Sequence, residues 1–125
     1  MNKLSVIGFL FIMLTILFTV TGQLLLKMGM HDIGVSPSQL VALPQFILRT
    51  FTNLKVLAGL SCAVIAAVAW MIAVSRSDLS LAYPFMGLAI VLVLALSPMV
   101  IGETVPGMRW VGVAVVCVGL WLTAR

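Results

Sequence analysis

Charged side chains are rare in this chain of 125 residues, of which seven are Lys or Arg and three are Asp or Glu. A soluble domain normally carries about 25% charged residues, against 8% here. Charges this few cannot cover a surface that faces water, and 63% of the residues are hydrophobic. The composition therefore excludes a soluble globular domain, including a catalytic one, and indicates an integral membrane protein.

The residue types that carry most enzyme and metal chemistry are also few. The chain has one His and two Cys. Its sequence contains no nucleophile–base pair, paired carboxylates, metal-ligand cluster or phosphate-binding loop. His31 has no partner of this kind, and Cys62 and Cys117 stand inside apolar runs, where small packing residues are expected. We therefore predict no enzyme, no metal and no cofactor.

The net charge of +4 does not indicate a nucleic-acid partner. The basic residues stand singly at the ends of apolar runs, where such side chains act as interfacial anchors. They divide between the two sides of the expected membrane, with Lys3, Arg76 and Arg125 on one side and Lys27, Arg49, Lys55 and Arg109 on the other. This division leaves the orientation of the chain open.

Long apolar runs are what the sequence does have. A helix needs about 20 apolar residues to cross a bilayer core of roughly 30 Å. Four runs approach this length, at residues 4–26, 56–75, 79–101 and 106–123. Open strands cannot satisfy their backbone polar groups in lipid, so we predict an all-α fold, with four transmembrane helices in a single domain, 1–125.

The connection between the first two runs is the only long one. Residues 28–34 are expected to form a turn and loop, and Ser36 followed by Pro37 has the form of a helix start. Residues 38–52 place apolar and polar side chains on opposite sides of a helix, with Pro44 as the site of a bend. This pattern predicts an amphipathic helix at the membrane interface, with a gate for the substrate as the alternative.

Polar side chains recur in the first apolar run at intervals of four residues. Thr15, Thr19, Gln23 and Lys27 therefore share one face of a helix, with Gly22 beside them. Gln and Lys are costly in hydrocarbon, so this face is expected to meet other helices or a wet cavity. Lys27 would attract an anionic head group, and the other three would offer hydrogen bonds. The alternative is that Lys27 only extends to the interface while Gln23 bonds a neighbouring helix.

Further candidates for substrate binding lie at the ends of the later runs. Tyr83 precedes a proline near the start of the third run, and Glu103 and Arg109 flank the start of the fourth. A carboxylate just before a helix favours the positive end of its dipole, so Glu103 has a structural cap or a local ion pair as its alternative role. Trp70, inside the second run, is expected to be a packing residue.

Two glycines in the fourth run suggest a contact between subunits. Gly112 and Gly119 are seven residues apart and lie on nearly the same helix face. Small residues on one face let two helices approach closely in lipid. We therefore predict a dimer contact on this helix.

Several short motifs resemble the four-helix members of the drug/metabolite transporter superfamily. Residues 20–24 (Val-Thr-Gly-Gln-Leu) followed by Lys27 are similar to the end of helix one in those proteins. Residues 81–84 (Leu-Ala-Tyr-Pro), then Gly102, Glu103, Arg109 and Gly112, resemble the EamA-type half of the same superfamily. In the small multidrug resistance branch, a glutamate in helix one exchanges protons for cationic drugs. That position falls on Thr19, and residues 4–26 contain no acidic side chain.

The nearer likeness is to the small paired flippase subunits that move aminoarabinose-phosphoundecaprenol across the inner membrane. Those proteins similarly show a Gly-Gln pair followed by Lys in helix one and an Ala-Tyr-Pro start to helix three. The resemblance implies a multi-pass protein of the bacterial inner membrane with a lipid-linked sugar as substrate. A homodimer or a heterodimer with a second four-helix subunit is expected, since a single four-helix chain is thin for a transport pathway.

The sequence thus predicts a transporter subunit that flips an undecaprenyl-phosphate-linked sugar or a related anionic lipid. The first alternative is a small multidrug-type exporter of small molecules that works without the helix-one glutamate. The second is a membrane scaffold that transports nothing and binds a glycosyltransferase or a partner subunit.

Overall fold

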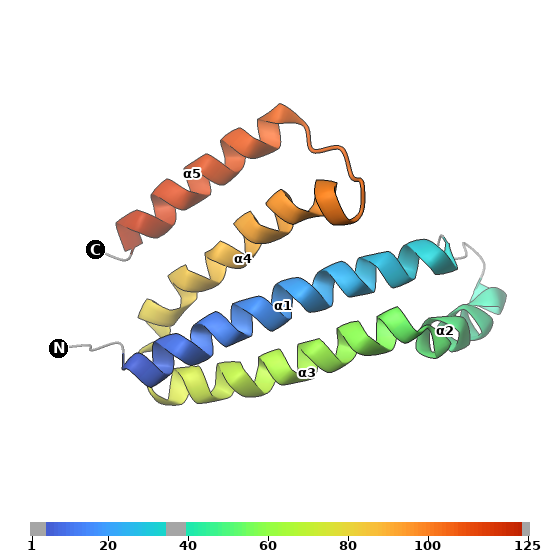
Figure 1. Ribbon diagram of the computed structural model, residues 1–125, viewed down its shortest axis with the longest axis horizontal. Coiled ribbons are helices and arrows are strands. Elements are labelled where there is room, and N and C mark those ends of the chain that lie inside the picture. Colours follow the sequence, from blue (N-terminus) through green and yellow to red (C-terminus); the bar gives the residue numbers. More distant parts are fainter. Residues whose placement is uncertain (1–4, 35–39, 124–125) are drawn as a thin grey trace.

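The fold is a row of long helices. The computed structural model describes residues 5–34 and 40–123 and contains no strand within those ranges. Its elements are α1 (Val6–Ile33), a 3₁₀ turn η1 (Leu40–Ala42), α2 (Leu43–Thr52), α3 (Leu54–Ser75), α4 (Leu79–Val100) and α5 (Gly107–Thr123). Helix α1 lies between α3 and α4, and α5 packs on the outer side of α4 (Figure 1). The predicted all-α class is confirmed.

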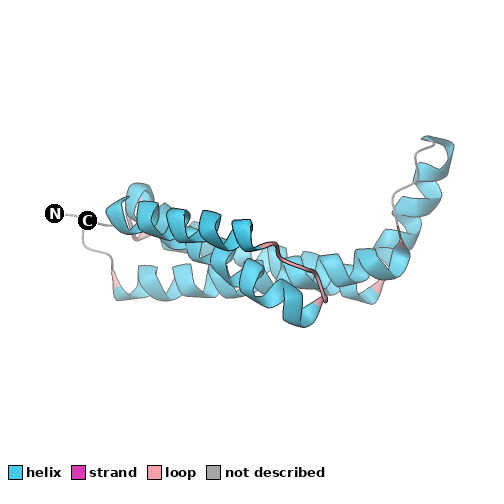
Figure 2. Ribbon diagram, turned by 90° about the horizontal axis from the view of Figure 1, so that it is seen from above, coloured by secondary structure: helices cyan, strands magenta, loops and turns pink. Residues whose placement is uncertain are grey.

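Three of the helices are long and apolar enough to cross a membrane. They are α1 with 28 residues and α3 and α4 with 22 residues each. Helix α5 is also apolar but has 17 residues. Helix α1 begins and α5 ends at the same end of the molecule, as both views show (Figures 1 and 2).

The first helix is longer than the sequence pattern predicts. Residues 28–33 continue α1 to Ile33, although the sequence pattern predicts a turn and loop there. The helix ends at Gly34, whose backbone φ is 93° and whose N–H donates a hydrogen bond to the Met30 carbonyl oxygen. Twenty-eight residues make a helix of about 42 Å, longer than the roughly 30 Å of a bilayer core. The last turns can therefore project beyond the hydrocarbon, where His31 and Asp32 are solvated, so the end of the apolar run did not mark the end of the helix.

The segment after α1 differs in part from the expected helix over residues 38–52. The predicted helix start at Ser36 and Pro37 lies outside the described residues, as do the first two residues of that range. Pro44 is the second residue of α2, just after the 3₁₀ turn η1. At the position of the expected bend, the chain changes from a 3₁₀ turn to an α-helix. Figures 1 and 2 show α2 turned away from the long helices, at the end where α3 begins.

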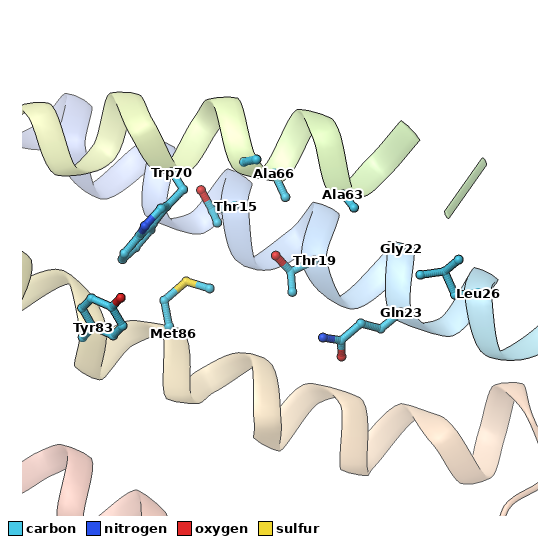
Figure 3. Close-up of a pocket in the computed structure, with 11 residues that line it drawn as sticks. Thr15, Thr19, Gly22, Gln23, Leu26, Ala63, Ala66, Trp70, Tyr83 and Met86 are labelled. Carbon is cyan, nitrogen blue, oxygen red and sulfur yellow. The ribbon is translucent and has the colours of Figure 1, made fainter. Parts of the chain in front are cut away.

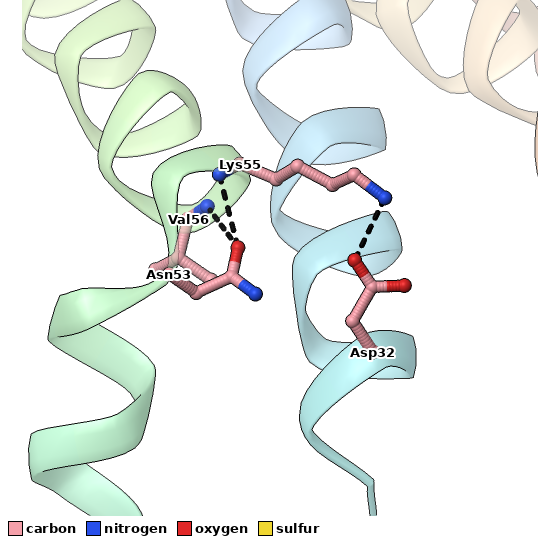
Figure 4. Close-up of polar contacts among 4 residues, drawn as sticks. All are labelled: Asp32, Asn53, Lys55 and Val56. Carbon is pink, nitrogen blue, oxygen red and sulfur yellow. Dashed lines mark hydrogen bonds and ion pairs between the residues drawn. The ribbon is translucent and has the colours of Figure 1, made fainter.

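Asn53 lies between α2 and α3 and is the N-cap residue of α3. Its backbone is extended, and its side-chain oxygen accepts hydrogen bonds from the backbone N–H groups of Lys55 at 2.9 Å and Val56 at 3.2 Å (Figure 4). This side chain satisfies donors that have no partner inside the helix. The Lys55 ammonium also reaches Asp32 of α1 at 2.7 Å, which ties the two helices together at this end.

Helices α1 and α3 approach closely because glycines meet where they cross. A methyl group at Gly59 would lie 2.9 Å from the Gly22 carbonyl oxygen and 2.8 Å from a carbon of Leu26. Small residues at such a crossing allow backbone contact without large side chains between the helices. On a neighbouring face, α1 supplies larger apolar side chains that pack in one cluster with alanines of α3 and α4: Ile12, Ile16, Val20 and Leu24 with Ala73, Ala82 and Ala89.

We predict that Gly59→Val destabilises the protein, because the new side chain would overlap the Gly22 backbone. Overpacking of this kind typically costs about 1–3 kcal/mol. The midpoint of thermal unfolding in detergent should fall by several degrees. Gly107→Val is the matched control, since a side chain there meets no atom within 4 Å. Equal midpoints for the two variants would contradict the close crossing.

We also predict that Asn53→Ala weakens the start of α3. Loss of a helix N-cap costs about 1 kcal/mol, and the amides of Lys55 and Val56 would lose their acceptor. Hydrogen exchange at these two amides should become faster. Asn53→Asp keeps a capping oxygen and should leave the exchange slow. Exchange that stays slow in Asn53→Ala would show that the Asn53 side chain does not cap α3.

Candidate functional site

An open cleft of about 540 Å³ lies between α1, α3 and α4. We call it the central cleft and show it in Figure 3. Helix α1 lines one wall with the polar face predicted from the sequence, α3 adds small residues and one tryptophan, and α4 closes the other side. Its lining consists of Thr15, Thr19, Gly22, Gln23 and Leu26 from α1, Ala63, Ala66, Ala67 and Trp70 from α3, and Tyr83 and Met86 from α4.

The polar groups of α1 differ in how far they are available to a ligand. Thr15 is buried, and its hydroxyl donates to the Phe11 carbonyl oxygen at 2.8 Å, so its hydrogen is already used. Thr19 is half-buried and Gln23 is exposed, and Figure 3 shows both pointing into the space between α1 and α4. Within residues 5–34 and 40–123, no hydrogen bond joins the Gln23 amide to another side chain. Gln23 is therefore the most available hydrogen-bonding group of this wall.

Two aromatic rings stand at one end of the central cleft. Trp70 of α3 and Tyr83 of α4 meet edge to face, with centroids 5.4 Å apart and planes at 85° (Figure 3). Such a pair stabilises by about 0.5–1.5 kcal/mol beyond the area it buries. Trp70 thus has the packing contact expected from the sequence and also lines the cleft. The pair is a direct side-chain link between α3 and α4.

A second cleft, of about 240 Å³, continues from Gln23 toward the end of α1. We call it the charged cleft, because Lys27, Glu103 and Arg109 line it together with apolar residues of α4. The Lys27 ammonium lies 3.0 Å from a carboxylate oxygen of Glu103, and the two side chains are 58% and 40% exposed. Gln23 lines both clefts, so polar groups continue from the middle of α1 to this ion pair.

The seven predicted substrate-binding positions therefore fall on two adjoining clefts. Thr15, Thr19, Gln23 and Tyr83 line the central cleft, and Gln23, Lys27, Glu103 and Arg109 line the charged cleft. The two glycines of the predicted dimer contact, Gly112 and Gly119, line neither cleft. They are exposed on α5, where an added methyl group would meet no atom within 4 Å.

Sequence reasoning did not place Met86 or the alanines of α3 in the site. Ala63, Ala66 and Ala67 carry no polar signal, and they matter because their small side chains leave room opposite the α1 wall. The Lys27–Glu103 pair was also missed as a pair, since 76 residues separate its members. A spacing rule along one helix cannot detect such a contact.

The helices and the two clefts define a multi-pass membrane protein with a polar path along one face of its first helix. Comparison with known proteins gives the family. The chain is 34% identical over 97 residues to a probable 4-amino-4-deoxy-L-arabinose-phosphoundecaprenol flippase subunit ArnF of Shewanella sediminis, covering 72% of this chain and 67% of that relative. It is 27% identical over 79 residues to a probable ArnE subunit of the same kind of flippase from Pseudomonas savastanoi, covering 63% of this chain and 69% of the relative.

A probable ArnE subunit of Pseudomonas syringae is 30% identical over 67 residues, covering 54% of this chain and 62% of that relative. No protein-family model matches the chain. No solved structure matches it either. The chain belongs to the family of small flippase subunits that includes these ArnE and ArnF proteins, and it is a multi-pass protein of the bacterial inner membrane.

We predict that the central cleft admits water as far as Gln23. In a background of Cys62→Ala and Cys117→Ala, the thiol of Gln23→Cys should react with a water-soluble maleimide roughly tenfold faster or more than that of Leu17→Cys, because only a hydrated thiol ionises readily. Leu17 is 60% exposed on α1 but does not line the cleft, so it reports a surface that faces lipid. Equal rates would mean that the Gln23 face also meets the acyl chains.

Proposed function

We propose that this chain is one subunit of a flippase that moves an undecaprenyl-phosphate-linked sugar, or a related anionic lipid, across the inner membrane. The observation that supports the proposal best is the continuous polar wall of α1. It leads through Thr19 and Gln23 in the central cleft to Lys27 in the charged cleft. The curated relatives carry names of subunits of such a flippase, which agrees with this assignment.

The difficulty in flipping a lipid is its head group, because the tail can stay in hydrocarbon throughout. A sugar phosphate loses its hydrogen bonds to water in the bilayer core, and each unpaired polar group costs several kcal/mol there. The Gln23 amide and the Thr19 hydroxyl would replace part of these hydrogen bonds inside the central cleft. Lys27 and Arg109 would attract the phosphate at the end of the path.

The apolar lining of the central cleft suits a substrate that has a polar head group and an apolar tail. Leu26, Met86 and the alanines of α3 line the cleft beside the polar wall. A polyprenyl chain attached to the head group could leave between helices into the bilayer without crossing a polar surface. Transport would then require only the sugar phosphate to follow α1.

We propose that α5 is the fourth membrane-spanning helix. Its 17 residues give a length of about 26 Å, slightly less than a bilayer core of roughly 30 Å, which local thinning of the bilayer can accommodate. Helix α2, whose Leu48 and Phe51 side chains are exposed, would lie at the membrane interface. Four such spans would agree with the four-helix members of the drug/metabolite transporter superfamily, which the sequence motifs resemble.

The functional unit would contain two such subunits, either identical or different. Among the described helices α5 packs only on α4, and none of its residues within 107–123 is buried. Gly112 and Gly119 leave its outer face open to a helix of a second subunit. A second subunit would also close the open side of the central cleft, since transporters of this kind usually build the site between repeats.

We predict that Gln23→Ala and Lys27→Ala each lower translocation of the lipid-linked sugar by about tenfold or more, because hydrogen bonds to charged groups contribute about 1.5–3 kcal/mol. The measurement is the rate at which the head group becomes accessible on the far side of reconstituted vesicles. Assembly in the membrane should be unchanged.

Lys55→Ala is the matched control for Lys27→Ala. It also removes a lysine from an ion pair at the same end of the molecule, but Lys55 pairs with Asp32 and lines neither cleft. Full translocation by Gln23→Ala and Lys27→Ala would remove the basis of the flippase proposal. Increased sensitivity of these variants to cationic compounds, with lipid movement intact, would favour an exporter instead.

A further inference from the structure

We propose that His31 extends the polar wall of α1 into a docking site for a lipid phosphate at the membrane surface. In this site the phosphate lies between the His31 ring and the Lys27 ammonium. The site recognises the phosphate and not the group that the phosphate carries, so it also takes a polyprenyl phosphate without a sugar. The inference rests on the proposed flippase function and adds to it a residue and a binding step outside the clefts.

His31 continues the spacing of the polar wall. It follows Lys27 by four residues, as Lys27 follows Gln23, and α1 remains helical to Ile33. Side chains four residues apart are neighbours on a helix, with Cβ atoms about 5–6 Å apart. Because the sequence pattern predicts a turn and loop at residues 28–34, it did not place His31 on this face. The structure therefore adds one helical turn to the wall.

His31 lines a small pocket next to the charged cleft, which we call the terminal pocket. The pocket has a volume of about 140 Å³ and lies between the end of α1, the start of α3 and the end of α4. Its lining consists of Met28, His31, Asp32, Lys55, Val100 and Ile101. Ile101 also lines the charged cleft, so the two hollows adjoin at this residue. A phosphate that leaves the charged cleft along α1 therefore reaches His31 next.

The His31 ring is available to a head group in water. At about 42 Å, α1 is longer than a bilayer core of roughly 30 Å, so its last turns can project beyond the hydrocarbon. His31 is exposed, and in the part of the chain that the structure describes no hydrogen bond or ion pair involves its ring. An imidazole carries one N–H donor when neutral and two when protonated. It can thus donate to a phosphate oxygen in either form.

His31 offers the phosphate a contact that replaces none inside the protein. The Lys27 ammonium is 3.0 Å from a Glu103 oxygen, and the Lys55 ammonium is 2.7 Å from an Asp32 oxygen (Figure 4). An anion at either lysine competes with a carboxylate that is already bound there. A phosphate between Lys27 and His31 shares the first lysine and gains a hydrogen bond from the ring without competition.

The charges around these two hollows favour an anion. The residues that line the charged cleft and the terminal pocket carry three positive and two negative side chains: Lys27, Lys55 and Arg109, and Glu103 and Asp32. Asp32 and Lys55 neutralise each other on the far wall of the pocket. Adjacent residues on a helix do not face each other, so Asp32 is turned away from the face that carries Lys27 and His31. We assign the Asp32–Lys55 pair no part in binding.

The size of the terminal pocket limits what it can recognise. Its 140 Å³ equals the volume of only a few water molecules, at about 30 Å³ each. A phosphate group can enter, and a sugar attached to it would remain in the water outside. This is the reason to expect binding of a lipid phosphate with or without a sugar.

The first test observes the His31 ring by NMR. Protein with ¹⁵N-labelled histidine is prepared without a histidine tag, together with any subunit that co-purifies, in phosphatidylcholine nanodiscs. The chain has one His, and the signals absent from His31→Gln belong to its ring. Sugar-free polyprenyl phosphate should shift these signals until the site is saturated. Polyprenol, which has the same tail without the phosphate, should leave them unchanged.

The second test measures equilibrium binding of radiolabelled polyprenyl phosphate to variants. His31→Ala should weaken binding by about tenfold, as expected for loss of a hydrogen bond to a charged group. His31→Gln keeps an N–H donor and should retain more of the affinity. Arg49→Gln is the matched control, because it removes an exposed basic residue of α2 that is not part of the lining of the clefts or the terminal pocket. This control should bind as the wild type does.

The outcomes separate this inference from the proposed function. His31→Ala should weaken binding of a sugar-linked polyprenyl phosphate by the same factor, and a clearly larger loss would show that His31 also contacts the sugar, against the proposal. If polyprenyl phosphate binds without a shift of the ring signals, or His31→Ala binds it as the wild type does, docking at His31 is wrong while the flippase function stands. If the wild type binds neither lipid, both fail.

Inorganic phosphate and ordinary phospholipids carry the same chemical group, so both are tested as competitors. Inorganic phosphate at the same concentration should not shift the ring signals, because it lacks a tail that holds it at the membrane surface. Phosphatidylglycerol at the same mole fraction should compete weakly, because two acyl chains instead of one must find room beside α1. Equal competition by either would assign the pocket to that ligand and overturn docking of the transported lipid.

Discussion

Helices α1 and α3 meet so closely at Gly22 and Gly59 that their backbones are in contact, and the position of the polar wall depends on this crossing. Because α3 covers the Gly22 side of α1, the side that carries Thr19 and Gln23 is turned toward α4. Larger residues at the crossing would separate the helices and rotate this wall. A contact made entirely of small apolar groups therefore determines where the hydrogen-bonding groups lie.

The polar groups of α1 become more exposed from Thr15 toward Lys27, as a lipid environment requires. Deep in the helix, Thr15 bonds the Phe11 carbonyl and presents no unpaired hydrogen to the cleft. Farther along, Gln23 is exposed, and at the end Lys27 meets Glu103. Unpaired polar groups are most costly where water is absent and least costly near the interface. The charged groups thus stand at the end of the polar wall, where an unpaired polar group is least costly.

The sequence predicted the polar wall because it lies on one helix, where a spacing of four residues places side chains on one face. It did not predict the end of α1, because apolar composition reports the thickness of the bilayer and not the length of the helix. It assigned no cleft-lining role to Ala63, Ala66 and Met86, whose importance depends on what they face across the gap. The contact of Lys27 with Glu103 depends on how α4 and its following loop pack against α1, which no local pattern contains.

A lysine without a partner at the end of the cleft would distinguish poorly between lipids. It is a point charge that attracts any phosphate, whatever else the head group carries. Because Glu103 already neutralises Lys27, an entering anion must first displace a carboxylate. An anion that binds Lys27 therefore gains less than it would at an unpaired lysine, because the new contact replaces the one that Lys27 already makes with Glu103.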